Sequence, residues 1–87
     1  MREPALLRRV EPVYPPLARQ AGVQGEVVID AVIDTQGNVV QERLISGSPL
    51  LFQAASDALR QWKYQPTQLS GQPVAVELTV TIHFKLQ

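Results

Sequence analysis

The sequence predicts an α+β domain in which a three-stranded, antiparallel-type sheet of strand order 2-1-3 carries two helices packed on one face. Three observations lead to this fold class. Residues 25–45 have the pattern of a hairpin, residues 48–62 have the spacing of an amphipathic helix, and residues 74–86 place an apolar side chain at every second position. A period of two residues indicates a half-buried strand, whereas a period between three and four indicates a helix.

The first eleven residues form a mixed segment that precedes the domain proper, which we expect to span residues 12–87. Leu6, Leu7 and Val10 are compatible with a short apolar stripe, and Pro4 suits a first helical turn. A frayed arm is the alternative. Arg2 follows Met1 directly, which suggests that Met1 is only an expression start and that the chain is a piece of a longer protein.

A short helix is predicted from Pro16 to Ala21. Proline is favoured at the first helical position, and Gly22 provides a stop. Leu17 and Ala21 share a face of this helix. The prolines before it enforce an extended entry, because a residue that precedes proline avoids the helical region.

The hairpin pattern that follows has one clearly apolar face. Its turn is expected within residues 34–38, with Gly37 available for a positive φ. The return strand, Val39 to Ile45, alternates poorly, and a bulge whose position the pattern does not give would explain the change of phase. The residues expected on the buried face of the first strand are Val27, Ile29, Ala31 and Ile33.

The second helix is the more strongly predicted one. Ser48 is a good N-cap and Pro49 suits the first turn. The apolar stripe comprises Leu51, Ala55, Ala58, Leu59 and Trp62, and the residues expected to face water are Gln53, Ser56, Asp57, Arg60 and Gln61. Trp62 and Tyr64 are interpreted as core residues, Pro66 ends any continuation, and residues 67–73 are expected to form a loop.

The helix between the second and third strands makes a crossover connection, so the third strand is expected to pair with the first. The long last strand then lies at an edge of the sheet, and its free backbone groups are available to a partner strand. The outward amides alternate, so they belong either to Thr79 and Thr81 or to Val80 and Ile82. The pattern does not distinguish these two sets.

Composition and residue inventory argue against several function classes. The 87-residue chain has no cysteine, so it has no disulfide, thiolate metal site or thiol nucleophile, and no cofactor is expected. Its eight basic and eight acidic residues cancel, which gives no electrostatic footprint for nucleic acid. His83 has no second metal ligand at a suitable spacing, and Asp30 and Asp34 are better explained by hairpin chemistry than by a catalytic pair. We therefore do not expect an enzyme.

Two stretches carry a resemblance to a known family. "YPPLARQAGVQGEVVIDAVIDTQGNV" and "ISGSPLLFQAASDALRQWKYQP" resemble the TonB C-terminal domain family, with matching positions throughout residues 12–86. The equivalent of the family's Gln-Pro-x-x-x-Tyr-Pro stretch is residues 11–15, which match in their Tyr-Pro half. The residues that match the family's pattern, in the order in which they occur, are Tyr14, Pro15, Gly22, Gly25, Asp34, Gly37, Ala54, Ala55, Trp62, Tyr64, Pro66, Gly71 and Pro73.

The resemblance implies a periplasmic domain that is anchored to the inner membrane in the full-length protein. The missing N-terminal region would couple it to an inner-membrane motor complex driven by proton-motive force. Its partner would be a TonB-dependent outer-membrane transporter, whose extended TonB-box peptide adds to the last strand. A homodimer formed through the same edge is the alternative. The partner-binding residues expected on these grounds are Thr79, Val80, Thr81, Ile82, His83, Phe84, Tyr14 and Pro15.

Overall fold

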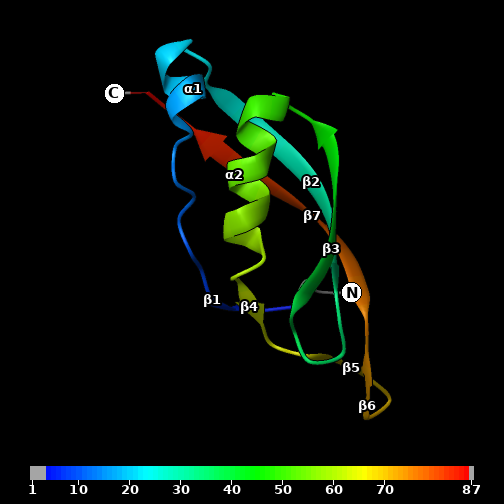
Figure 1. The fold of residues 1–87 in the computed structure, drawn as a ribbon. Coiled ribbons are helices and arrows are strands. Elements are labelled where there is room, and N and C mark those ends of the chain that lie inside the picture. The colour runs from blue at the N-terminus through cyan, green and yellow to red at the C-terminus, as the bar shows by residue number, and fades with distance from the viewer. Residues whose placement is uncertain (1–3, 87) are drawn as a thin grey trace.

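The computed structural model describes residues 4–86 and has the predicted architecture. Its central sheet has the strand order β3-β2-β7, formed by Val39–Ser46, Gly25–Ile33 and Val76–Phe84, with both neighbouring pairs antiparallel. The helices are α1 (Pro16–Gln20) and α2 (Pro49–Leu59). Helix α2 lies across one face of the sheet, while α1 lies at the end where β7 finishes (Figure 1). The 2-1-3 order predicted from the crossover is therefore confirmed.

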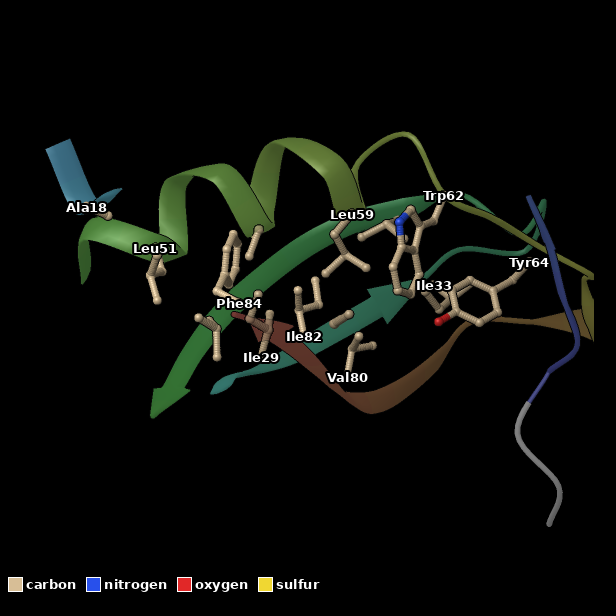
Figure 2. Packing of buried hydrophobic residues seen from close by; sticks show 14 residues of the cluster. Ala18, Ile29, Ile33, Leu51, Leu59, Trp62, Tyr64, Val80, Ile82 and Phe84 are labelled. Carbon is tan, nitrogen blue, oxygen red and sulfur yellow. The ribbon is translucent and has the colours of Figure 1, made fainter. Parts of the chain in front are cut away.

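The core lies between α2 and the sheet. Figure 2 shows Leu51 and Leu59 pointing from the helix toward Ile29 and Ile82 of the strands. All four side chains are at most 2% exposed. The buried residues predicted for the first strand are confirmed, since Val27, Ile29, Ala31 and Ile33 are at most 1% exposed.

Strand β3 contains two bulges, which explain its poor alternation. The register of β3 against β2 slips by one residue next to Val28 and again next to Val32. The slips leave Ile45 and Val40 without register partners, and these side chains are 49% and 53% exposed. Bulges twist a strand and interrupt its ladder, so this edge of the sheet is poorly suited to accept another strand.

The β2–β3 turn is closed by Asp34. The backbone amide of Asn38 donates to the Asp34 carboxylate at 2.8 Å and that of Gln36 at 2.9 Å. The amide of Asn38, more than any other group, holds the pKa of this carboxyl below its ordinary value. Gly37 adopts a φ of 87°, as predicted, and its carbonyl accepts a hydrogen bond from the amide of Tyr64 at 2.9 Å.

Gly37→Val is expected to destabilise the domain more than Gly71→Val. Both glycines have a positive φ, at 87° and 78°, so valine is strained at either position by about 1–3 kcal/mol. A side chain at Gly37 would in addition collide with the carbonyl oxygen of Tyr64, whereas Gly71 has open space around it. Urea unfolding of the two variants measures the difference. Equal midpoints would show that the Tyr64 contact is unimportant.

Helix α2 differs from its prediction at two places. Ser48 caps it as expected, accepting from the amide of Leu50 at 3.2 Å, but the helix ends at Leu59 and Trp62 lies in the turn beyond. Ser56, expected to face water, is only 3% exposed. The reason is that Phe52 also packs on the core, which widens the buried arc of the helix to include position 56.

The N-terminal segment is neither a helix nor a frayed arm within the described residues. Leu6–Arg8 form strand β1, which pairs antiparallel with β4 (Lys63–Tyr64). The indole nitrogen Nε1 of Trp62 donates to the carbonyl of Val10 at 2.9 Å, and the amide of Gln65 donates to the carbonyl of Ala5 at 2.8 Å. Strands of only two or three residues are too short to show a periodic side-chain pattern, so the sequence did not predict this pairing. The part of the arm formed by residues 1–3 lies outside the described residues.

Two further expectations, both for residues 67–86, need correction. Residues 67–73 are not a loop, because β5 (Thr67–Leu69) and β6 (Gln72–Val74) form a small hairpin. Strand β7 spans Val76–Phe84 and is therefore shorter than the strand predicted from the alternation of residues 74–86, because Val74 belongs to β6. In α1, for which the sequence predicted a shared face of Leu17 and Ala21 but no buried residue, Ala18 is buried and Leu17 is 69% exposed.

Candidate functional site

One edge of β7 is unpaired in the part of the chain that the structure describes. Strand β7 pairs with β2 in an unbroken register of nine residue pairs, from Val76 opposite Ile33 to Phe84 opposite Gly25. No other described strand pairs with β7. The regular register contrasts with the two bulges of β3 at the opposite edge.

The direction of the free backbone groups follows from the β2–β3 turn. The amide of Asp34 donates to the carbonyl of Asn38 at 2.9 Å, so it points toward β3. Backbone groups alternate along a strand, and the odd-numbered residues of β2 therefore point toward β7. Their register partners on β7 are even-numbered. We infer that the outward backbone groups of β7 include those of Thr79 and Thr81, which selects one of the two sets that the sequence left open.

The side chains on β7 divide between core and surface. Val80, Ile82 and Phe84 are 7%, 2% and 5% exposed and belong to the core. Their side chains are therefore occupied with packing. Thr79 and Thr81 lie on the opposite, exposed face of the strand.

Polar contacts on the exposed face of the sheet connect the side chains of β7, β2 and β3. The hydroxyl of Thr79 donates to the Asp30 carboxylate at 3.0 Å, and Arg43 on β3 donates to the same carboxylate at 2.9 Å. His83 lies 3.9 Å from Glu26. Asp30 thus belongs to a cross-strand network and Asp34 to the β2–β3 turn, as expected from hairpin chemistry.

Tyr14 and Pro15 have separate positions. The Tyr14 hydroxyl donates to the carbonyl of Val23, and its ring meets Phe84 edge-on with 5.5 Å between centroids. Tyr14 therefore lies at the end of β7, among the other predicted site residues. Pro15 is the N-cap of α1 and lines a groove of about 330 Å³ between the N-terminal segment and α2. The structure does not bring Pro15 to the free edge.

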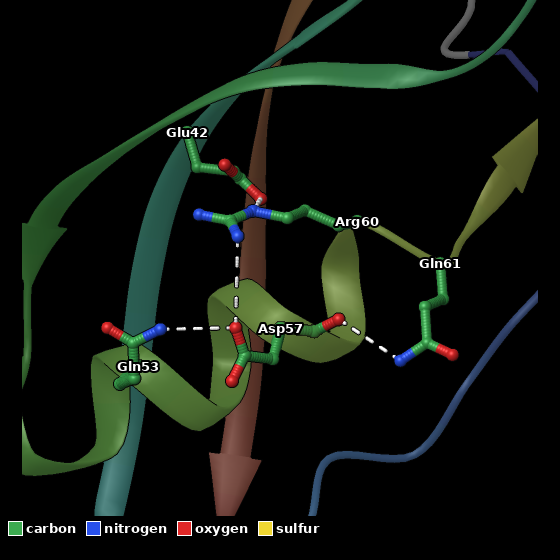
Figure 3. Close-up of polar contacts among 5 residues, drawn as sticks. All are labelled: Glu42, Gln53, Asp57, Arg60 and Gln61. Carbon is green, nitrogen blue, oxygen red and sulfur yellow. Dashed lines mark hydrogen bonds and ion pairs between the residues drawn. The ribbon is translucent and has the colours of Figure 1, made fainter.

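A polar network holds the end of α2 against β3 (Figure 3). The Glu42 side chain is 9% exposed, and one of its carboxylate oxygens lies 3.4 Å from Nε of Arg60. Asp57 lies 3.9 Å from Arg60 and accepts a hydrogen bond from Gln53 at 3.1 Å. The network positions the helix over the sheet. Its residues lie on the face opposite the network of Asp30 and Arg43.

Residues 4–86 contain no group of three or more His, Asp or Glu side chains placed to hold a metal ion. Among them, no helix has the length and apolar character needed to cross a membrane.

A family model described as "Gram-negative bacterial TonB protein C-terminal" matches residues 10–86. Among curated proteins, the chain is 41% identical over 88 residues to Protein TonB of Vibrio cholerae, covering 98% of this chain and 36% of that protein. It is 42% identical over 77 residues to Protein TonB of Xanthomonas campestris, covering 86% of this chain and 34% of that protein. The chain thus spans about a third of the length of these relatives.

Two solved structures have a similar fold. The solution NMR structure of the Pseudomonas aeruginosa TonB CTD superposes with a TM-score of 0.77 at 26% identity, covering 94% of this chain and 85% of that one. A structure from the molecular characterisation of the TonB2 protein of Vibrio anguillarum superposes with a TM-score of 0.68 at 37% identity. It covers 100% of this chain and 85% of that one.

Proposed function

The chain belongs to the TonB C-terminal family, and on this premise we propose that it captures an extended peptide along the free edge of β7. The peptide would be the TonB box of an outer-membrane transporter, added to the sheet as a fourth strand beside β7. In the full-length protein the domain would act in the periplasm. A preceding N-terminal region would anchor it to the inner membrane and connect it to a motor complex that uses the proton-motive force.

The observation that carries this proposal is the regular, one-sided pairing of β7. Nine consecutive residues pair with β2 on one side, so their backbone groups alternate between the sheet and the free edge. A peptide that pairs with this edge forms main-chain hydrogen bonds, each worth about 0.5–1.5 kcal/mol net. Side-chain pockets would then add modest specificity, as in other cases of strand addition.

The opposite edge of the sheet supports the choice of β7. The bulges of β3 leave Val40 and Ile45 out of register, and a bulged edge offers an irregular row of donors and acceptors. Strand addition requires a regular row. Among the three described strands of the central sheet, only β7 combines such a row with a free side.

The alternative is a homodimer in which the β7 edges of two copies pair with each other. It uses the same backbone groups, so the two functions compete for one surface. The two functions depend on different concentrations. Dimerisation needs two copies of the domain and is lost on dilution, whereas capture depends on the concentration of the peptide.

A dilution series followed by light scattering, combined with peptide titration, tests the proposal. We expect a monomer that binds a labelled TonB-box peptide. A matched peptide that is N-methylated at the alternate residues whose amides face β7 should bind much more weakly, because it has lost the backbone donors that pair with this strand. A stable dimer that excludes the peptide would support the assembly function instead, and a monomer that binds neither peptide would overturn both.

A further inference from the structure

A small basic hollow lies at the end of β7. It has a volume of about 270 Å³ and is lined by Tyr14, Arg19, Lys85 and Leu86. Arg19 belongs to α1, and Lys85 directly follows Phe84, the last residue of β7. Figure 1 shows α1 beside the C-terminal end of β7, so two cationic side chains from distant parts of the sequence meet at one end of the free edge.

Arg19 is held in position by aromatic contacts. Its guanidinium carbon lies 5.2 Å from the centre of the Tyr14 ring, within the range of a cation–π interaction. Tyr14 is itself fixed by its hydrogen bond to Val23 and its edge-on contact with Phe84. The contact with Tyr14 therefore favours a position of the Arg19 guanidinium near the end of β7 before any partner arrives, which lowers the entropic cost of binding an anion there.

Neither cation of this hollow has an acidic partner within residues 4–86. Most of the ion pairs within residues 4–86 involve Arg9, Arg43 or Arg60, and the remaining one joins His83 to Glu26. Glu77, near the opposite end of β7, likewise has no ion pair among the described residues. Two cations without an ion pair thus lie at the Phe84 end of the free edge, beside the Glu26 carboxylate that lines a neighbouring hollow with Lys85. One carboxylate without an ion pair among the described residues, that of Glu77, lies near the Val76 end.

We propose that the hollow of Arg19 and Lys85 binds the carboxylate of an acidic residue that flanks the captured peptide segment. Main-chain pairing alone leaves the peptide free to slip along β7 in steps of two residues. An acidic residue that must reach Arg19 and Lys85 would select one register and one polarity of the peptide. This inference rests on the proposed capture by β7, and it names the side-chain chemistry of the partner.

Four blocked peptides test the inference. Each has a core of seven alternating valine and threonine residues and one added residue, either Asp or Asn, at its N-terminal or its C-terminal side. We expect Asp to bind about fivefold more tightly than Asn at one of the two sides at low salt, since an exposed ion pair contributes modestly. At the other side, which would lie near Glu77, Asp should give no gain. Fluorescence anisotropy measures the four affinities.

Variants then assign the effect to the two cations. The preference for Asp should disappear when Arg19→Gln and Lys85→Gln are combined, and it should persist in Arg19→Lys, which keeps the charge. Arg8→Gln is the matched control, because Arg8 also lacks an ion pair in the structure but lies on β1. High salt should remove the preference, because the charges are solvent-accessible.

The possible outcomes separate this inference from the proposed function. If the Asn peptides bind but Asp gives no advantage on either side, capture by β7 stands and the role of the basic hollow is wrong. The same holds if the advantage survives in the double variant. If none of the four peptides binds, capture at the β7 edge fails and this inference fails with it.

Discussion

Proline at Thr79 or Thr81 is expected to abolish peptide binding and leave a folded domain, whereas proline at Val80 or Ile82 is expected to unfold it. The first two residues direct their backbone groups outward by the alternation inferred from Asp34, so proline there removes a donor from the free edge and obstructs the partner. The expected loss of affinity is at least about tenfold, because one hydrogen bond and the close approach of the strands are lost together.

Val80 and Ile82 differ from the two threonines in both backbone and side chain. Their amides would point into the ladder with β2, and their side chains are 7% and 2% exposed. Proline there breaks the ladder and removes a buried aliphatic group, at a cost of about 1.5–3 kcal/mol for the side chain alone. A domain of this size has a total stability of roughly 5–15 kcal/mol, so the combined loss is a large part of it.

Circular dichroism and peptide titration on the four proline variants measure these effects. Thr79→Ala and Thr81→Ala are the controls, because they keep the backbone amide and should bind nearly as well as the wild type. Four unfolded proline variants would mean that β7 is paired on both sides within the monomer, which contradicts edge capture. Folded Val80→Pro and Ile82→Pro variants that fail to bind the peptide, beside unfolded Thr79→Pro and Thr81→Pro variants, would show that the inferred alternation is reversed.

Trp62→Ala is expected to lower the free energy of unfolding by about 3–5 kcal/mol, as large aromatic truncations in protein cores do. The Trp62 side chain is 6% exposed and packs near Tyr64, with 6.4 Å between ring centroids. Its indole nitrogen also donates to the carbonyl of Val10 at 2.9 Å, so the truncation would also weaken the attachment of the N-terminal segment.

Trp62→Phe separates these two contributions. It keeps an aromatic ring in the core but cannot donate to Val10, so it should cost less than alanine and still weaken the attachment of the N-terminal segment. Denaturant midpoints give the total loss, and amide exchange of residues 6–8 reports the attachment of β1. A midpoint of Trp62→Ala equal to that of the wild type would contradict the placement of Trp62 in the core.

The sequence by itself determined the elements whose side chains repeat with a regular period. The alternation around Ile29 and Ile82 predicted β2 and β7 with their buried faces, and the stripe from Leu51 to Leu59 predicted α2. The crossover length then predicted the strand order. These features can be predicted because burial of one face imposes a period of two on the apolar residues of a strand and of about 3.6 on those of a helix. The spacing of the apolar residues therefore indicates the secondary structure.

Features that depend on backbone pairing or on neighbours distant in sequence were decided only by the tertiary structure. The β1–β4 pairing and the β5–β6 hairpin involve two or three residues per strand, too few to show a period. Ser56 is buried because Phe52 also packs on the core and widens the buried arc of α2. The hollow of Arg19 and Lys85 exists because α1 lies beside the end of β7, and these residues are 66 positions apart in the sequence. A single charged residue is not part of a periodic pattern, so the sequence alone did not predict that Arg19 and Lys85 lie close together.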